Sequence, residues 1–145
     1  GANAVNAGVT SPAIDGINST TGGRGVVVRI APTRQALTSP TVRLTVDSSL
    51  ALSCETSSSC GNTKIPFTSI GWTSTDATNP NQGDIQSSSI TGSGSQQIAS
   101  YAASAGFLSF EVNVMSNTLN FSYANNTLYP AGTYRGAVKF TATIL

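Results

Sequence analysis

The fold of this chain is decided by the stretch YPAGTYRGAVKFTATIL, residues 129–145. Pro130 and Gly132 predict a turn. From Tyr134 onward every second residue is apolar or small, and the residues between are mostly polar. A period of two over this length predicts a half-buried β-strand that runs to the last residue. We therefore expect the chain to end inside its own sheet, with no later strand to cover that edge. The apolar positions are Tyr134, Gly136, Val138, Phe140, Ala142 and Ile144.

Similar alternation recurs at short intervals along the rest of the chain. Val42, Leu44 and Val46, for example, alternate with polar residues. No window of helical length carries an apolar stripe of helical period, so we expect almost no helix. Short strands separated by polar turns predict an all-β fold, an antiparallel immunoglobulin-like β-sandwich. The expected strands span residues 24–30, 41–47, 64–72, 96–101, 108–114, 119–123 and 134–145.

The middle of the chain predicts a bend and a loop. The apolar phase changes between Phe67 and Ile70, which indicates a bulge or bend within the strand 64–72. The stretch 73–83 is rich in turn residues and is predicted to be a loop. We expect Trp72 to be a core anchor, because buried aromatic side chains dominate the packing of small β domains.

The composition excludes several classes of function. The 145 residues suffice for one domain with a core of its own. Charged residues make up 9% of the chain, against roughly a quarter in an average soluble protein. The seven Lys and Arg residues are scattered, which argues against a nucleic-acid partner. The longest apolar run, Val26-Val27-Val28, excludes a membrane-spanning helix. Gly1 in place of Met is expected of a secreted product whose signal peptide has been removed.

The two cysteines predict a structural disulfide. Cys54 and Cys60 are separated by five residues, a spacing that matches neither the CxxC redox motif nor a set of zinc ligands. A bridge across so short a ring contributes roughly 2 kcal/mol on the loop-entropy model. If the pair is oxidised, the protein belongs outside the cytosol.

No residue pattern predicts catalysis, a cofactor or a metal site. The chain has no histidine, which excludes Ser-His-Asp and Cys-His arrangements. Asp76 and Asp84 flank one loop, and we interpret both as solvated loop residues rather than as paired glycosidase carboxylates. With Asn79 and Asn81 they offer oxygen ligands for calcium, but without the spacing of an EF-hand. We therefore expect no enzyme activity.

The N-terminal part differs from the rest in composition. Residues 1–23 form an extension rich in Gly, Ala, Asn, Ser and Thr, and residues 24–145 form the β-sandwich domain. In the extension apolar and polar residues alternate, which fits either a detached strand or a disordered leader. A flexible joint is expected at residues 20–23. The alternating apolar residues are Val5, Ala7 and Val9; candidate glycosylation sequons lie at Asn18, Asn120 and Asn125.

A long apolar edge strand aggregates unless another strand pairs with it. The sequence leaves two alternatives for the strand that pairs with residues 134–145. An internal strand would make the domain self-sufficient. An extended segment from another chain would bind the edge through backbone hydrogen bonds instead.

The two ends of the chain resemble those of fimbrial subunits assembled by donor-strand exchange, the chaperone-usher pilins and related secreted fibre proteins. Gly132 is the fourteenth residue from the end, as the family's glycine often is, and it precedes an alternating last strand. The alternating leader matches the family's mobile N-terminal extension. Two positions differ from the family pattern: Ile144 replaces an aromatic residue, and the two cysteines are neighbours rather than on distant strands.

The resemblance implies an incomplete sandwich that the N-terminal donor strand of a neighbouring copy completes. Val5, Ala7 and Val9 would fill an acceptor groove lined by the apolar positions of residues 134–145. The implied function is a structural subunit of an extracellular pilus or fibre at the cell surface, supporting adhesion or biofilm. Its partners would be copies of itself, with a secretion chaperone and an outer-membrane assembly platform.

The alternative function is a monomeric secreted carbohydrate-binding or adhesin module. Such modules stack sugars on a planar row of exposed aromatic residues. Most aromatic residues here fall on the apolar phase of expected strands. The remaining candidates are Tyr101, Phe107 and Tyr129.

Overall fold

The computed structural model describes residues 3–5, 25–31, 40–78, 83–103, 113–124 and 127–145. In these ranges β-strands dominate, and every strand pair is antiparallel. Helical structure in the described ranges is limited to one turn of α-helix, α1 (Ser57–Cys60), and a 3₁₀ turn, η1 (Phe67–Ser69). The prediction of an all-β fold with almost no helix is therefore confirmed.

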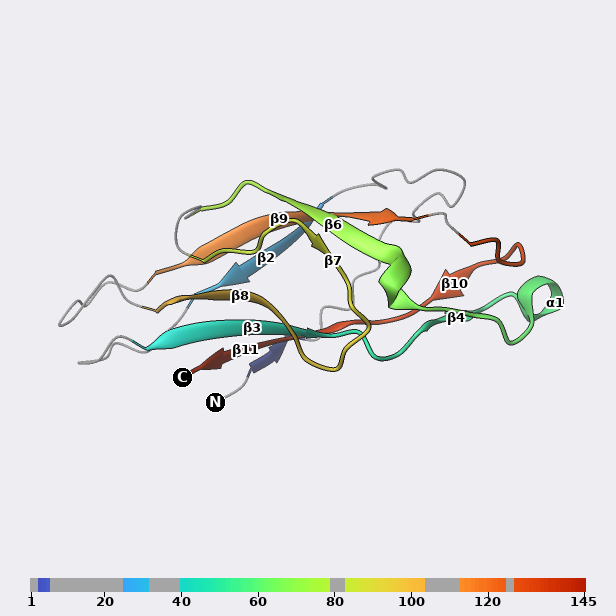
Figure 1. Cartoon of the computed structure of the whole chain (residues 1–145), viewed down its shortest axis with the longest axis horizontal. Helices are drawn as coiled ribbons and strands as arrows, with labels where there is room; N and C mark the ends of the chain where they lie inside the picture. The colour runs from blue at the N-terminus through green and yellow to red at the C-terminus, as the bar shows by residue number, and fades with distance from the viewer. Residues whose placement is uncertain (1–2, 6–24, 32–39, 79–82, 104–112, 125–126) are drawn as a thin grey trace.

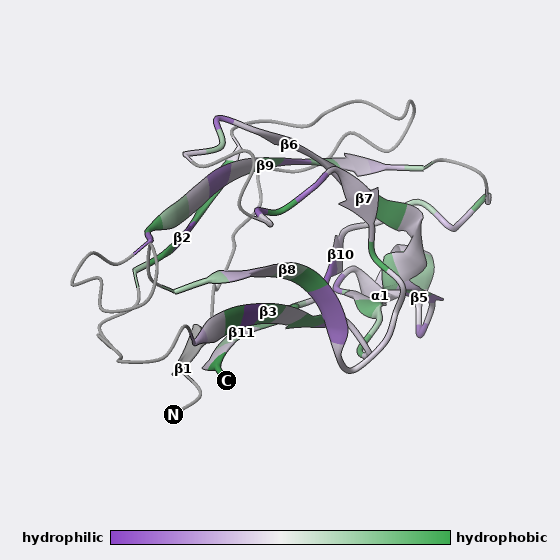
Figure 2. Ribbon diagram, turned by 60° about the vertical axis from the view of Figure 1, so that its left-hand side comes forward, coloured by the Kyte–Doolittle hydropathy of each residue, from purple (hydrophilic) through white to green (hydrophobic). Residues whose placement is uncertain are grey.

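The strands form three sheets, and two larger ones lie as layers with the core between them (Figures 1 and 2). One four-stranded sheet has the order β1 (Asn3–Val5), β11 (Lys139–Ile144), β3 (Thr41–Asp47), β8 (Gln96–Ala102). The other has the order β2 (Val26–Ile30), β9 (Met115–Tyr123), β6 (Ile70–Thr75), β7 (Ser88–Ser89). A small sheet, β10 (Tyr134–Arg135), β4 (Leu52–Cys54), β5 (Lys64–Ile65), lies near one end of the long axis.

The core consists of inward-facing apolar side chains from both layers, as the alternation predicts. Trp72 is 5% exposed and its indole Nε1 donates a hydrogen bond to the Gln86 carbonyl at 2.9 Å, so its predicted place in the core is confirmed. Burying the ring while satisfying its N–H avoids the free-energy cost of an unpaired donor. Other core residues are Val42, Leu44, Val46, Ile70, Ile85, Ile90, Met115, Leu119 and Phe140.

The prediction of one strand over residues 134–145 is wrong. Tyr134 and Arg135 form β10 in the small sheet, and β11 begins at Lys139 in a different sheet. Gly136 lies between them, where the chain passes close to other side chains. A Cβ there would lie 2.8 Å from Cζ of Phe67 and 3.0 Å from Cδ2 of Leu52. The alternating pattern is continuous in sequence, but close packing at Gly136 separates it into two strands.

The boundaries of two other predicted elements also differ from those in the structure. The expected bend before Ile70 is confirmed as the turn η1, but β6 continues to Thr75, so the loop predicted for residues 73–83 begins too early. Thr73, Ser74 and Thr75 are in a strand because they pair with Asn120, Leu119 and Thr118 of β9.

The strand predicted at 119–123 is the second half of a nine-residue strand, β9. Of the strand predicted at 108–114, residues 108–112 lie outside the described ranges. Asn113 and Val114 are not in a strand.

The position of residues 83–87 depends on a glycine. Gly83 has φ of 80°, and a Cβ added there would overlap the carbonyl oxygen of Ser100 in β8. The Ser100 N–H donates to the Gly83 carbonyl at 3.1 Å, so a backbone hydrogen bond accompanies this close approach. Only glycine allows both the backbone conformation and the contact.

We predict that Gly83→Ala destabilises the fold more than the matched variant Gly61→Ala. Gly61 also has a positive φ, 57°, but a Cβ there meets nothing within 4 Å. Gly61→Ala should cost about 1–3 kcal/mol for the backbone conformation alone, and Gly83→Ala that amount plus the collision. Urea denaturation measures both, and equal losses would contradict the role of the Ser100 contact.

Candidate functional site at the edge of strand β11

The last strand, β11, lies between two strands of its own chain. On one side β3 pairs with all six residues from Lys139 to Ile144. On the other side β1 pairs antiparallel, with Asn3 opposite Ala142, Ala4 opposite Thr141 and Val5 opposite Phe140. The two strands lie side by side in Figures 1 and 2. Of the two partners open to the last strand, the coordinates show the internal one: the outer edge of β11 is closed by the N-terminal extension of the same molecule.

Among the described residues, the pairing with β1 extends over part of β11. β1 is three residues long and β11 is six. Among the described residues, Thr143 and Ile144 pair with β3 alone.

Burial of the apolar side chains changes along the same strand. Phe140, opposite Val5, is 6% exposed. Ala142 and Ile144 are only partly buried against the core, although the inward residues of the neighbouring β3 are 1–2% exposed. Among the described residues, the apolar side chains toward the C-terminal end of β11 are therefore less buried than Phe140.

The six predicted groove residues do not line one continuous strand. Phe140, Ala142 and Ile144 are in β11. Tyr134 is in β10, Gly136 is exposed between the strands, and Val138 precedes β11 and packs partly buried against the core. Of the predicted donor residues, Val5 is in β1, while Ala7 and Val9 lie outside the described ranges.

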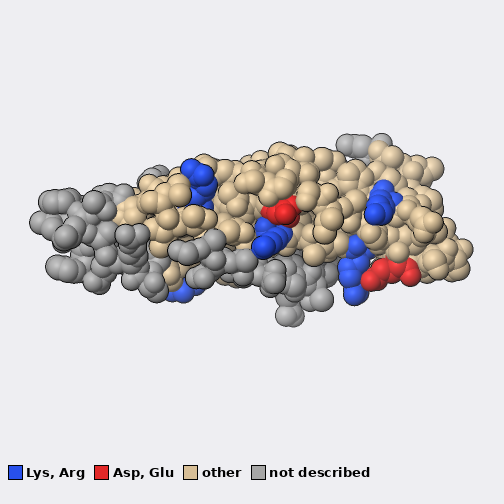
Figure 3. Space-filling view, turned by 90° about the horizontal axis from the view of Figure 1, so that it is seen from below, with Lys and Arg blue, Asp and Glu red and all other residues tan. Residues whose placement is uncertain are grey.

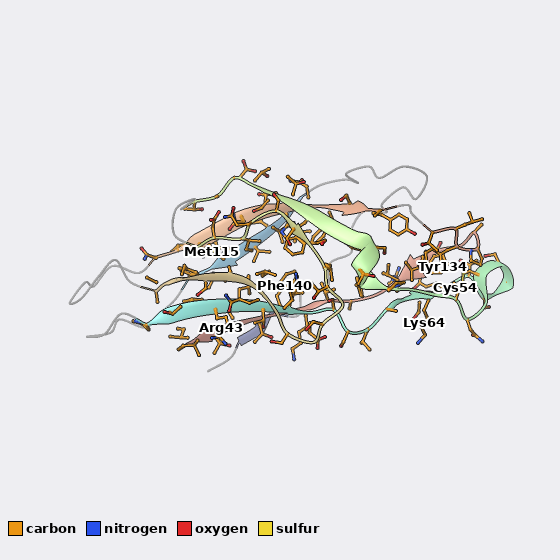
Figure 4. All side chains as sticks on the ribbon, viewed as in Figure 1. Arg43, Cys54, Lys64, Met115, Tyr134 and Phe140 are labelled. Atoms are coloured by element: carbon orange, nitrogen blue, oxygen red, sulfur yellow. A yellow bond between two sulfur atoms is a disulfide. The ribbon has the colours of Figure 1, made fainter. Side chains whose placement is uncertain are left out.

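The disulfide between Cys54 and Cys60 is present, with a Cα–Cα distance of 5.9 Å. It closes a loop beside β10 at the end of the molecule away from the end of β11 (Figure 4). Gly132 packs directly on it, since a Cβ there would lie 2.5 Å from Sγ of Cys60. The Glu55 N–H donates to the Thr133 carbonyl at 2.7 Å, and the Thr133 N–H donates to Oγ1 of Thr56 at 3.0 Å. The disulfide loop therefore holds the turn that leads into the last strands.

The solvated-loop interpretation is wrong for Asp84, which is 6% exposed. Its carboxylate accepts hydrogen bonds from Nε2 of Gln86 at 2.7 Å and Nδ2 of Asn117 at 3.2 Å. Asp76 is exposed, as expected, and lies with Asp84 on a polar pocket of about 290 Å³. The suggested calcium ligands Asn79 and Asn81 are outside the described ranges. Within those ranges no three His, Cys, Asp or Glu residues gather in a way that could hold a metal.

Asn117 is the structural residue that the sequence reasoning missed. It is 1% exposed in β9, and its Oδ1 accepts a hydrogen bond from the Ile85 N–H at 3.4 Å. Its Nδ2 lies within hydrogen-bond distance of Oγ of Ser74 and of Asp84. A polar residue between Met115 and Leu119, in the apolar phase of the strand, is the signal that marks it.

The two described aromatic residues among the candidates for sugar stacking, Tyr101 and Tyr129, do not form an exposed row. Tyr101 is 4% exposed, and burial raises the pKa of its phenol to about 12. Tyr129 is half-buried, and Phe107 lies outside the described ranges. Burial also raises the pKa of Tyr123, with smaller contributions from the phenols of Tyr129 and Tyr134. Nothing in this arrangement favours the carbohydrate-binding alternative.

Of the three sequons, only Asn120 falls in the described ranges, where it is half-buried on β9. Its Nδ2 donates a hydrogen bond to Oγ1 of Thr75 at 3.3 Å. Asn18 and Asn125 lie outside those ranges.

Charges are spread thinly over the face shown in Figure 3, where the described Lys and Arg residues stand apart from one another. The ion pair between Arg135 and Glu55, at 3.2 Å, is exposed and therefore adds little stability. No helix in the described part of the chain has the length and apolar character needed to cross a membrane. Comparison of the chain with models of known protein families, with curated proteins and with solved structures gives no match.

We predict that Asn117→Leu destabilises the fold by about 1–3 kcal/mol, the usual cost of leaving buried polar groups unpaired. The substitution takes a donor from the Asp84 carboxylate and the acceptor from the Ile85 N–H. Asn120→Leu, on the opposite face of the same strand, is the matched control and should change the free energy of unfolding by less than about 0.5 kcal/mol. Equal urea midpoints for the two variants would show that the buried network is not needed.

We also predict that replacing both Cys54 and Cys60 by Ala lowers the free energy of unfolding by roughly 2 kcal/mol. The measurement is urea denaturation of the oxidised wild type beside the double variant. Because Cys60 contacts the turn at Gly132, hydrogen exchange at Glu55 and Thr133 should accelerate in the variant. Unchanged exchange there would contradict the role of the disulfide in holding this turn.

Proposed function

We propose that this chain is a structural subunit of an extracellular fibre whose copies are joined by strand exchange. In the fibre the N-terminal extension of one copy pairs with the outer edge of β11 in the next, completing an immunoglobulin-like sandwich. The observation that carries the proposal is the antiparallel pairing of β1 with β11. The pairing is internal to one chain, and it supports the proposal because the extension fits this edge in backbone direction and register.

Exchange between copies needs no new contacts. The hydrogen bonds of a strand pair form equally well whether the second strand comes from the same chain or from an identical one. In sequence, residues 6–24 separate β1 from the first described residue of the body, Gly25. A swap between copies depends on the length of this connection in sequence.

In this register the apolar residues of the N-terminal extension would lie opposite the apolar residues of the C-terminal stretch 134–145. Residues directly opposite in an antiparallel pair share a face of the sheet, and Val5 is opposite Phe140. If the same register continued in a longer trans strand, Ala7 would lie opposite Val138 and Val9 opposite Gly136. A slip of one residue would place polar positions against the apolar phase of β11.

The partial burial of two side chains of the last strand is compatible with the same proposal. Ala142 and Ile144 retain partly exposed apolar surface, which contact with a neighbouring copy would bury. The disulfide and the low charge suit an extracellular setting, where the fibre would support adhesion or biofilm. A secretion chaperone and an outer-membrane platform are the assembly partners that the pilin resemblance suggests.

We predict that the wild-type protein forms filaments and that the double variant Ala4→Pro/Val5→Pro does not. Successive N–H groups of a strand point to opposite sides, so one of the two prolines removes a donor directed at β11. The variant should keep its all-β circular dichroism spectrum while remaining monomeric by size-exclusion chromatography and negative-stain microscopy.

The matched control is Thr20→Pro/Thr21→Pro, which places the same residues in the expected joint and should leave filaments intact. A wild type that stays monomeric over a wide range of concentrations would overturn the proposed function. Normal filaments from the Ala4/Val5 variant would overturn the assigned donor segment.

A further inference from the structure

We propose that β1 is an autoinhibitory strand: by pairing with β11 of its own chain it closes the edge to other copies, and it must leave before a second copy binds. The proposal rests on the function proposed above, because it concerns the regulation of the same edge. It goes beyond that function in assigning the N-terminal segment a second role within the single molecule.

The geometry makes the two pairings exclusive. A strand has two hydrogen-bonding edges, and β3 occupies one edge of β11 along its whole length. The other edge is taken by Asn3–Val5 at Phe140, Thr141 and Ala142. A strand from another copy in the same register needs the same three positions. Binding in trans therefore requires release in cis.

The closure is built to be reversible. The described pairing consists of three residues, Asn3–Val5, and so short a strand on a sheet edge opens at low free-energy cost. In the same register a longer trans strand continues with Ala7 opposite Val138 and Val9 opposite Gly136. It therefore adds pairs that the described β1 does not make, so the longer pairing displaces the shorter one.

The strength of the inhibition depends on residues 6–24. A tethered segment competes at an effective concentration set by the length of its tether, which falls roughly as the −3/2 power of that length. Lengthening the tether should therefore weaken the closed state without touching β11. The closed form also protects an apolar edge from uncontrolled aggregation.

The test uses the full-length protein and a fluorescent peptide with the sequence of residues 1–14, and measures peptide binding by fluorescence polarisation. In the variant Ala4→Cys/Thr141→Cys the two new cysteines are directly opposite each other, at a separation that a disulfide can span. Oxidised, this variant should lose peptide binding. After treatment with a dithiol it should bind as the wild type does under the same treatment.

A second variant carries a Gly-Ser insertion after Gly23 that doubles the length of the tether. It should bind the peptide about threefold more tightly than the wild type, as the power law requires. The control is the wild-type protein, with its own Cys54–Cys60 disulfide, carried through the same oxidation step, which should leave its peptide binding unchanged.

Undiminished binding by the oxidised double cysteine variant, or no peptide binding by the wild type, would overturn the autoinhibition. So would unchanged affinity in the long-tether variant. Filament formation is scored separately. If peptide binding follows these expectations but the protein never forms filaments, the autoinhibition proposal stands. Only the proposed fibre function is then refuted.

Discussion

Backbone pairing along β11 is the constraint on which the rest of the structure depends. This strand joins the last part of the chain to β3 on one side and the first part to the body on the other. It also brings Phe140 into a core shared with Trp72 and Leu119 of the opposite layer. A strand that must satisfy backbone donors on two edges and apolar contacts on one face has few alternative positions.

Two local sets of contacts fix the positions of the elements around β11. At one end, the disulfide loop packs on Gly132 and binds Thr133, which places β10 before the chain passes Gly136 into the other sheet. In the opposite layer, buried hydrogen bonds between Asn117, Asp84 and Ile85 hold the segment after β6 against β9. Both sets of contacts depend on closely packed backbone segments or on buried polar groups. Small displacements of these atoms would break the contacts.

In the structure β1 pairs with β11 of its own chain and shields part of that edge. Under the two proposals the edge has two states: closed by β1 of the same chain, or open to the same segment of another copy. The fibre and the autoinhibition proposals describe two uses of a single contact, and their relative populations depend on the tether and on protein concentration rather than on new interfaces.

The sequence by itself determined the strand content, the buried face of β3, the place of Trp72 in the core and the pairing of its two cysteines. Alternation, turn residues and a single cysteine pair are local properties that a chain carries in any context. Only the tertiary structure decided that residues 134–145 divide at Gly136, that Asp84 is buried on Asn117, and that β1 pairs with β11 of its own chain. Each of these depends on which distant segments approach closely enough to collide, to share a hydrogen bond or to compete for one edge. A local sequence pattern does not specify the distances between segments that are far apart in the sequence.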